Sequence, residues 1–167
     1  TRPGRAATVA AHMAGSSPIR SEVDLREYVE AYAAAPAFPH VVLDGFLRDE
    51  VAWEAFHAFP RHGDQDWTAY THFNEKKFGN TRLHSFPAPV RSVVEHLNSA
   101  AFVAELSALT GIPNLIPDPS LEGGGLHQSP PGGFLNIHAD FTSHPHQPGW
   151  RRRVNLLVFL NPHHQPE

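Results

Sequence analysis

The chain has 167 residues, of which 41% are hydrophobic and 18% charged, so its length suits one domain and its composition is not that of a disordered protein. The absence of cysteine excludes disulfides, thiolate zinc sites, iron–sulfur clusters and a cysteine nucleophile. The formal charge is −4, which does not suit a nucleic-acid-binding protein, and no apolar run approaches the roughly 20 residues of a membrane span. We therefore expect a cytoplasmic protein with neither a nucleic-acid partner nor a membrane.

The first two thirds of the chain predict a layer of helices. Residues 1–20, rich in Ala, Gly, Ser and Arg, are expected to form a flexible leader. A loose capping box at Ser21 opens a helix that Pro36 ends, and its apolar residues recur at helical spacing: Val23, Leu25, Tyr28, Val29 and Tyr32. Further helices are expected over 49–59, 89–97 and 100–109, with Gly111 as the C-cap of the last.

Strands are expected mainly after these helices. A short opening strand is predicted over 39–43, whereas 61–87 is polar, aromatic and irregular. Beyond Gly111, strand candidates are 114–116, 126–129, 134–141 and 152–160. The last is the strongest, because Val154, Leu156, Val158 and Leu160 alternate with Asn155, Leu157 and Phe159. This order predicts an α+β fold in which helices pack on a β-sandwich or jelly roll.

One tripeptide, His138-Ala139-Asp140, indicates metal chemistry. Alternate residues of a strand point to the same face, so this imidazole and carboxylate would project together. They would form two thirds of a 2-His-1-carboxylate facial triad, which holds Fe(II) and leaves positions open for co-substrate and oxygen. The tripeptide is a weak signal by itself, and the alternative is a hydrogen-bonded pair on a half-exposed strand.

The segments around the tripeptide strengthen the signal by their order. A glycine turn and an HQ strand fill 121–128, a GGF turn leads into the HxDF strand over 131–141, and an RRxNLLxxLN strand fills 152–161. The upstream segments 38–47, 67–80 and 109–112 fit the same pattern. Over about residues 36–167 the chain resembles the iron(II)/2-oxoglutarate-dependent oxygenases of the prolyl 4-hydroxylase-like superfamily, in particular their bacterial branch.

The resemblance implies a double-stranded β-helix, or jelly roll, with the N-terminal helices packed on it. It implies His138 and Asp140 as Fe(II) ligands, 2-oxoglutarate and O2 as co-substrates, and ascorbate as a candidate stimulant. The family's third ligand is a later histidine followed by Arg or Lys, for which His163 and His164 stand too early. We therefore expect a helical layer with one opening strand over 21–111, about half of the barrel over 112–167, and a native gene that continues beyond Glu167.

Further site residues follow from the resemblance, each with a plainer alternative. Gln128, Asn155 and Phe159 are expected on the co-substrate side, although Gln128 would otherwise face solvent and Phe159 would belong to the core. Opposite strand parity means that only one of His127 and Gln128 faces inward. The substrate-side residues are expected to be Asn136, Trp67 and Tyr70, the last two in a lid whose alternative is packing of the helical layer.

Two neighbouring features carry weaker expectations. His144 and His146 are expected in a mobile loop on the substrate side, with a second metal site as the alternative. At least two of the three consecutive arginines 151–153 are expected to be solvated residues at the start of a strand.

The expected function is that of an Fe(II)- and 2-oxoglutarate-dependent dioxygenase, which hydroxylates an unactivated C–H bond of an amino-acid-type substrate, free or peptidyl. One alternative is a cupin-type metal enzyme, because Gly132 and the later HxD tripeptide approach the cupin pattern GxxxxxHxH. A cupin glutamate would stand four or five residues after Asp140, where this chain has His144 and Pro145. The other alternative is a non-catalytic remnant of the fold that binds a partner.

Overall fold

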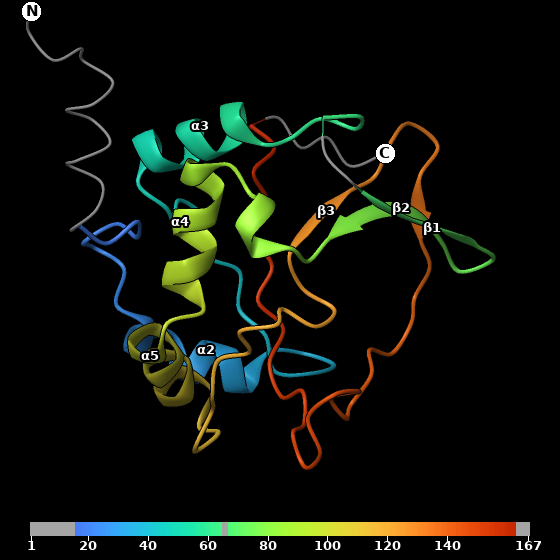
Figure 1. Cartoon of the computed structure of the whole chain (residues 1–167). Coiled ribbons are helices and arrows are strands. Elements are labelled where there is room, and N and C mark those ends of the chain that lie inside the picture. The colour runs from blue at the N-terminus through green and yellow to red at the C-terminus, as the bar shows by residue number, and fades with distance from the viewer. Residues whose placement is uncertain (1–15, 65–66, 163–167) are drawn as a thin grey trace, which may run out of the picture.

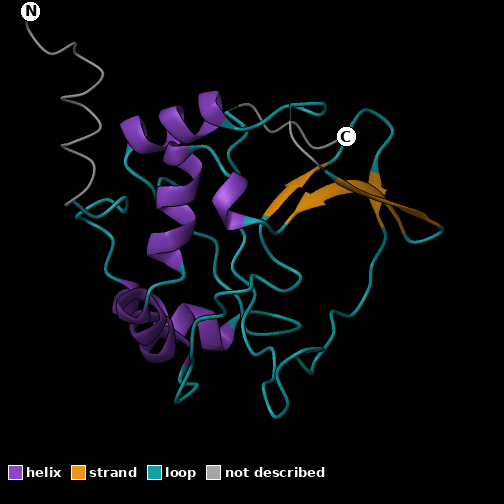
Figure 2. Cartoon of the chain, in the orientation of Figure 1, coloured by secondary structure: helices purple, strands orange, loops and turns teal. Residues whose placement is uncertain are grey.

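The computed structural model describes residues 16–64 and 67–162. Helices gather on one side of the molecule and strands on the other, and loops make up most of the chain after the last strand (Figure 1, Figure 2). The fold is α+β, as the order of the sequence patterns predicted, and its antiparallel sheet is open rather than the expected sandwich or jelly roll among the described residues. The sheet has four strands, and it does not close into a barrel within the described residues.

The first predicted helix forms in two pieces, η1 (Leu25–Tyr28) and α2 (Val29–Ala34). Its cap differs from the prediction, because the Asp24 carboxylate accepts the backbone N–H of Arg26, whereas the Ser21 hydroxyl donates to Glu22. The residues just before it are anchored rather than free. Arg20 donates to the carbonyl oxygen of Leu47 and pairs with Asp49, which corrects the expected leader over 16–20; residues 1–15 lie outside the described chain.

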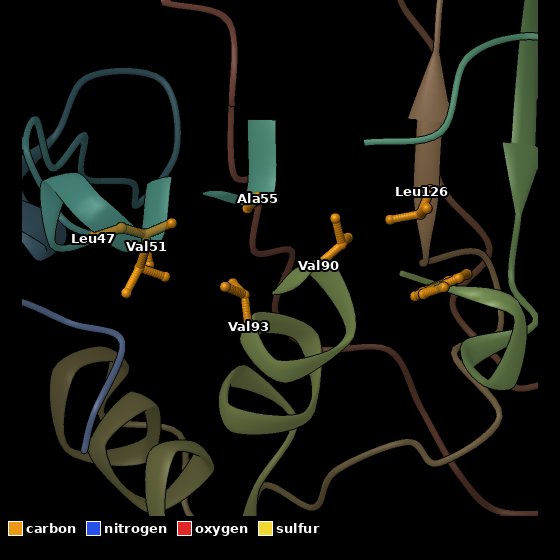
Figure 3. Packing of buried hydrophobic residues seen from close by; sticks show 7 residues of the cluster. Leu47, Val51, Ala55, Val90, Val93 and Leu126 are labelled. Carbon is orange, nitrogen blue, oxygen red and sulfur yellow. The ribbon is translucent and has the colours of Figure 1, made fainter. Parts of the chain in front are cut away.

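Two of the predicted helices pack against each other to form the main core. These are α3 (Asp49–Ala58) and α4 (Ala88–Leu97). The chain between them forms two strands of the sheet and then the short 3-10 helix η2 (Leu83–Ser85). Val51 and Ala55 of α3 and Val90 and Val93 of α4 are buried between the two helices. Figure 3 labels them together with other members of the same cluster, Leu47 and Leu126. Because Leu126 comes from the sheet, this cluster joins the helices to the strands.

A second, smaller core lies between α5 (Ala100–Thr110) and the first helix. Leu25, Phe102 and Leu109 are its buried residues. The ends of α5 have clear causes: the Ser99 hydroxyl accepts the Phe102 N–H, and Gly111 takes the left-handed conformation (φ 69°) that favours glycine at a C-cap. Gly111 was predicted in this role, and the prediction is confirmed.

The sheet begins in a segment that was predicted to be irregular. Strands β1 (Thr68–His72) and β2 (Glu75–Asn80) form an antiparallel hairpin in which Tyr70 pairs with Lys77. Polar and aromatic residues dominate both strands, so neither shows the apolar alternation by which a half-buried strand is recognised. The prediction for 61–87 was therefore wrong over 68–80.

Strands β3 (Leu126–Gln128) and β4 (Phe134–Leu135) both pair with β2 and lie end to end along its other edge. Leu126 is opposite Asn80, and Phe134 is opposite Lys76. The turn at Pro130–Gly133, closed by a hydrogen bond from the Gly133 N–H to the Pro130 carbonyl, bulges out between them. β4 stops at Leu135, so residues 136–141 of the predicted strand are loop.

Three predicted strands do not form among the described residues: 39–43, 114–116 and 152–160. The last had the clearest alternation, yet only Arg151 makes a bridge, to Ser143. Alternation reports which side chains would share a face, but a strand also needs a neighbouring backbone. Residues 153–160 find none in the described chain, and Phe159 is 76% exposed there.

Candidate metal-binding site

His138 and Asp140 lie close together, although the segment that carries them is a loop. Nε2 of His138 is 3.6 Å from Oδ1 of Asp140, and about two fifths of each side chain is exposed to solvent. Asn136 fixes the start of this loop, because its N–H donates to the Asn74 carbonyl and its side-chain amide donates to the Phe73 carbonyl. The start of the loop is therefore still bonded to the turn between β1 and β2, although the regular pairing of β4 with β2 has ended.

One hydrogen bond decides which nitrogen of His138 carries a proton. Nδ1 is 2.8 Å from the carbonyl oxygen of Asn136, and a carbonyl only accepts, so Nδ1–H is the donor. In the neutral imidazole, Nε2 then has a lone pair that points toward Asp140. A metal-binding histidine commonly has its second nitrogen held by a carbonyl in this way.

The Asp140 carboxylate is held from its other side by the segment that follows. The side-chain amide of Asn155 donates to Oδ2 at 2.5 Å, and Nη1 of Arg152 lies 3.4 Å from Oδ1. Asn155 was predicted to contact the co-substrate, but the structure engages its amide with the carboxylate. The segment 152–160 thus reaches the pair without forming a strand.

Arg152 is a site residue that the sequence analysis did not single out, because it expected at least two of the three arginines to be solvated without saying which. Its guanidinium donates to the Gly123 carbonyl at 3.3 Å and lies over the Phe141 ring, 4.9 Å from its centre. Gly123 (φ 68°) passes so close that a Cβ there would lie 2.6 Å from the Phe141 ring. The glycine turn predicted at 123–125 therefore packs directly behind the His138–Asp140 loop.

The other predicted site residues lie on other parts of the chain. Gln128 is on the sheet face that carries the buried Leu126, and its Oε1 is buried without a hydrogen-bond partner in the described chain. Trp67 packs against the main core and donates to the Arg61 carbonyl, which supports the packing alternative over the lid. Phe159 is exposed, and Tyr70 lies on the hairpin opposite Lys77.

The opposite sheet face carries a cluster of charged side chains. Lys77 pairs with Glu75 at 2.9 Å and lies over the Tyr70 ring, while Glu75 also contacts His72. The hydrogen bond from Lys77 lowers the pKa of Glu75 against a smaller opposing effect of burial. His127 shares this face. The surrounding protein lowers its pKa, helped by the positive charges of Lys77 and Arg152, although part of the ring remains open to solvent.

The loop after the pair, expected as a mobile loop on the substrate side, is held by contacts of His144. The His144 side chain is only 7% exposed, and its Nδ1 accepts the backbone N–H groups of His146 and Gln147. Its Nε2 lies 3.4 Å from Oδ2 of Asp118. Both ring nitrogens of His144 therefore take part in contacts that hold the loop, which argues against the second metal site.

No third ligand completes the pair within the described residues, because no group of three His, Cys, Asp or Glu side chains there is arranged to hold a metal ion. His163 and His164 lie outside the described chain. A cavity of about 610 Å³ lies elsewhere, between η2 and α4, and is lined by residues such as Arg82, His84 and Arg91. The candidate site is thus an open, two-ligand surface site.

Comparisons with protein families, with characterised proteins and with solved structures gave no match to this chain. In the part of the chain that the structure covers, none of the helices is both long and apolar enough to cross a membrane.

Proposed function

We propose that this chain belongs to an Fe(II)- and 2-oxoglutarate-dependent dioxygenase that hydroxylates an unactivated C–H bond of an amino-acid-type substrate, free or within a peptide. The observation that carries the proposal is the facing pair of acceptors, Nε2 of His138 and Oδ1 of Asp140. The order of the motifs around the pair supports the jelly-roll family, of which the open antiparallel sheet would be a part.

The donor set fits a divalent metal ion. When the imidazole is neutral, it and the carboxylate both present lone pairs, so a cation between them would make the contact favourable. Two ligand atoms in adjacent positions of an octahedral ion, each bonded at about 2.1 Å, lie about 3 Å apart. The observed 3.6 Å needs only a small adjustment in an exposed loop.

A proton is the competing cation, since a charged His138 would form an ordinary ion pair with Asp140. Two features would support a bound metal. In the neutral ring the Asn136 carbonyl keeps the proton on Nδ1 and leaves Nε2 available, and Asn155 holds the carboxylate from behind. Metal ligands are typically supported in this way by a second set of hydrogen bonds.

The chain's own residues would bind the metal ion and orient the substrate. His138 and Asp140 would hold Fe(II) on one face, which leaves the other faces for 2-oxoglutarate and O2. When bound, the iron with these co-substrates supplies the oxidising power for C–H hydroxylation. On the side of Asn136, the turn between β1 and β2 brings the exposed Phe73 close to the loop, so an apolar part of an amino-acid side chain would find a surface there.

The non-catalytic alternative has one observation in its favour, the absence of a third ligand among the described residues. The cupin alternative is weakened, because His144, which stands where a cupin glutamate is expected, is committed to Asp118 and the backbone.

The test is a Co²⁺ titration of the chain, followed by 2-oxoglutarate turnover. We expect His138→Ala and Asp140→Ala each to weaken Co²⁺ binding at least tenfold, whereas His40→Ala, a change at an exposed histidine elsewhere, leaves it unchanged. Succinate formation is then measured against separate panels of amino acids, peptides and alkylated nucleotides. Equal Co²⁺ affinity in the wild type and His138→Ala would refute the metal site, and turnover with nucleotides alone would refute the substrate class.

A further inference from the structure

Asn155 occupies an unusual position for an exposed residue. Its backbone belongs to the segment 152–160, which pairs with no strand in the described chain, yet its side-chain amide reaches Asp140 and bonds to Oδ2 at 2.5 Å. A hydrogen bond to an ionised acceptor is charge-assisted and stronger than one between neutral groups. The bond thus ties this segment to the candidate site.

The chemistry of the two groups fixes the direction of this bond. An ionised carboxylate only accepts, so the atom of Asn155 that faces Oδ2 must be the amide nitrogen. One lone pair of Oδ2 is then occupied, and the carboxylate cannot rotate freely. Oδ1 is left as the oxygen that faces Nε2 of His138.

Asn155 and Arg152 both touch Asp140, but they act differently on a bound cation. The guanidinium of Arg152 carries a positive charge next to Oδ1, so it would repel a divalent ion while it neutralises the carboxylate. The Asn155 amide is neutral and contacts the other oxygen. It therefore orients the carboxylate without opposing the metal.

We propose that Asn155 is a positioning residue for metal binding, which holds Oδ2 of Asp140 so that Oδ1 faces Nε2 of His138. This inference rests on the proposed function, since it concerns the same metal pair, and it replaces the expected contact of Asn155 with the co-substrate. Mutation of a supporting partner of this kind typically lowers metal affinity roughly 10- to 100-fold.

The first experiment uses the metal-free chain and observes the side-chain amides of Asn155 and Asn161 by NMR. Asn161 is exposed and directly follows the same segment, which makes it a matched reference. Asp140→Ala is expected to move the Asn155 amide signals upfield and to leave those of Asn161 in place. If the Asn155 signals do not respond, the hydrogen bond and the positioning role are refuted without any metal being present.

The second experiment titrates Co²⁺ into Asn155→Leu, which keeps the shape of the side chain but removes its donor. We expect at least a tenfold loss of affinity and a changed visible absorption band of bound Co²⁺, whereas Asn161→Leu matches the wild type. Asn155→Gln, which retains an amide, should recover part of the loss. Thermal unfolding of the metal-free variants is measured in parallel to separate positioning from stability.

The outcomes distinguish the two proposals. If Asn155→Leu binds Co²⁺ as tightly as Asn161→Leu while His138→Ala binds weakly, the positioning role is refuted and the metal site stands. Asn155→Leu could instead lose Co²⁺ affinity together with thermal stability, while Asn155→Gln recovers none of the affinity. In that case Asn155 only stabilises the fold, and the positioning role is refuted. If the wild type binds Co²⁺ no better than His138→Ala, the proposed function fails, and the positioning role fails with it.

Discussion

Nε2 of His144 meets Oδ2 of Asp118 at 3.4 Å, and this contact joins the loop after the His138–Asp140 pair to the loop that leads into the glycine turn. Asp118 is itself fixed to the helical layer, because its backbone exchanges hydrogen bonds with the side chain of Asn98 at the end of α4. A line of contacts therefore runs from the helices to the loop beside the candidate site.

The first prediction concerns His144. His144→Ala removes the acceptor for two backbone N–H groups and the contact with Asp118, so we expect the free energy of unfolding to fall by about 2 kcal/mol. His146→Ala is the control, since its side chain is 75% exposed and its ion pair with Glu122 spans 3.7 Å; the expected loss is below about 0.5 kcal/mol. Urea unfolding measures both, and equal losses would contradict the role of His144.

The second prediction concerns the glycine behind the site. Gly123→Ala would have to adopt φ 68° and would place a Cβ 2.6 Å from the Phe141 ring and 3.1 Å from Nη1 of Arg152. Gly132→Ala has a similar φ of 72° but open space around it, so it bears the backbone cost alone, about 1–2 kcal/mol. Chemical unfolding should show a larger loss for Gly123→Ala. Equal losses would mean that Phe141 and Arg152 move aside at no cost.

The third prediction concerns the incomplete ligand set. Two side chains hold a labile divalent ion loosely, so the wild-type chain should bind Co²⁺ weakly. Added imidazole supplies a further nitrogen ligand and should raise the apparent Co²⁺ affinity, but not in His138→Ala. The measurement is a Co²⁺ titration at several imidazole concentrations. An affinity that does not respond to imidazole would show that a side chain outside the described residues already fills the position.

The fourth prediction concerns pH. Burial lowers the pKa of His96, against a smaller opposing effect of Glu105, and burial together with Lys77 lowers that of His127. Since the folded state favours their neutral forms, the folded chain binds fewer protons than the unfolded chain below about pH 6.5. Stability should therefore fall as the pH drops from there through the lower folded pKa values.

His96→Gln and His127→Gln should each flatten this dependence, which thermal unfolding between pH 7 and pH 5 would measure. His40→Gln, at an exposed position, should leave the slope as in the wild type. A slope that neither His96→Gln nor His127→Gln changes would place the pH dependence on other groups.

The sequence by itself determined the helical layer and the two-residue centre of the candidate site. The helices over 49–58, 88–97 and 100–110 follow from apolar periodicity and local caps, which depend on residues at most four positions apart. His138 and Asp140 come together for the same reason, because they are only two residues apart and share a short loop.

Only the tertiary structure decided which distant residues support that centre. The hairpin at 68–80 lacks apolar alternation and forms because the backbones of its two strands pair. The segment 152–160 alternates clearly but forms no strand, because it makes no strand pairing in the described chain. In the same way, Arg152 and Asn155 reach Asp140, and Gln128 turns toward the core, through packing between segments far apart in the chain. Short-range patterns fix periodicity and caps, but contacts at long sequence separation depend on how the whole chain buries its apolar surface.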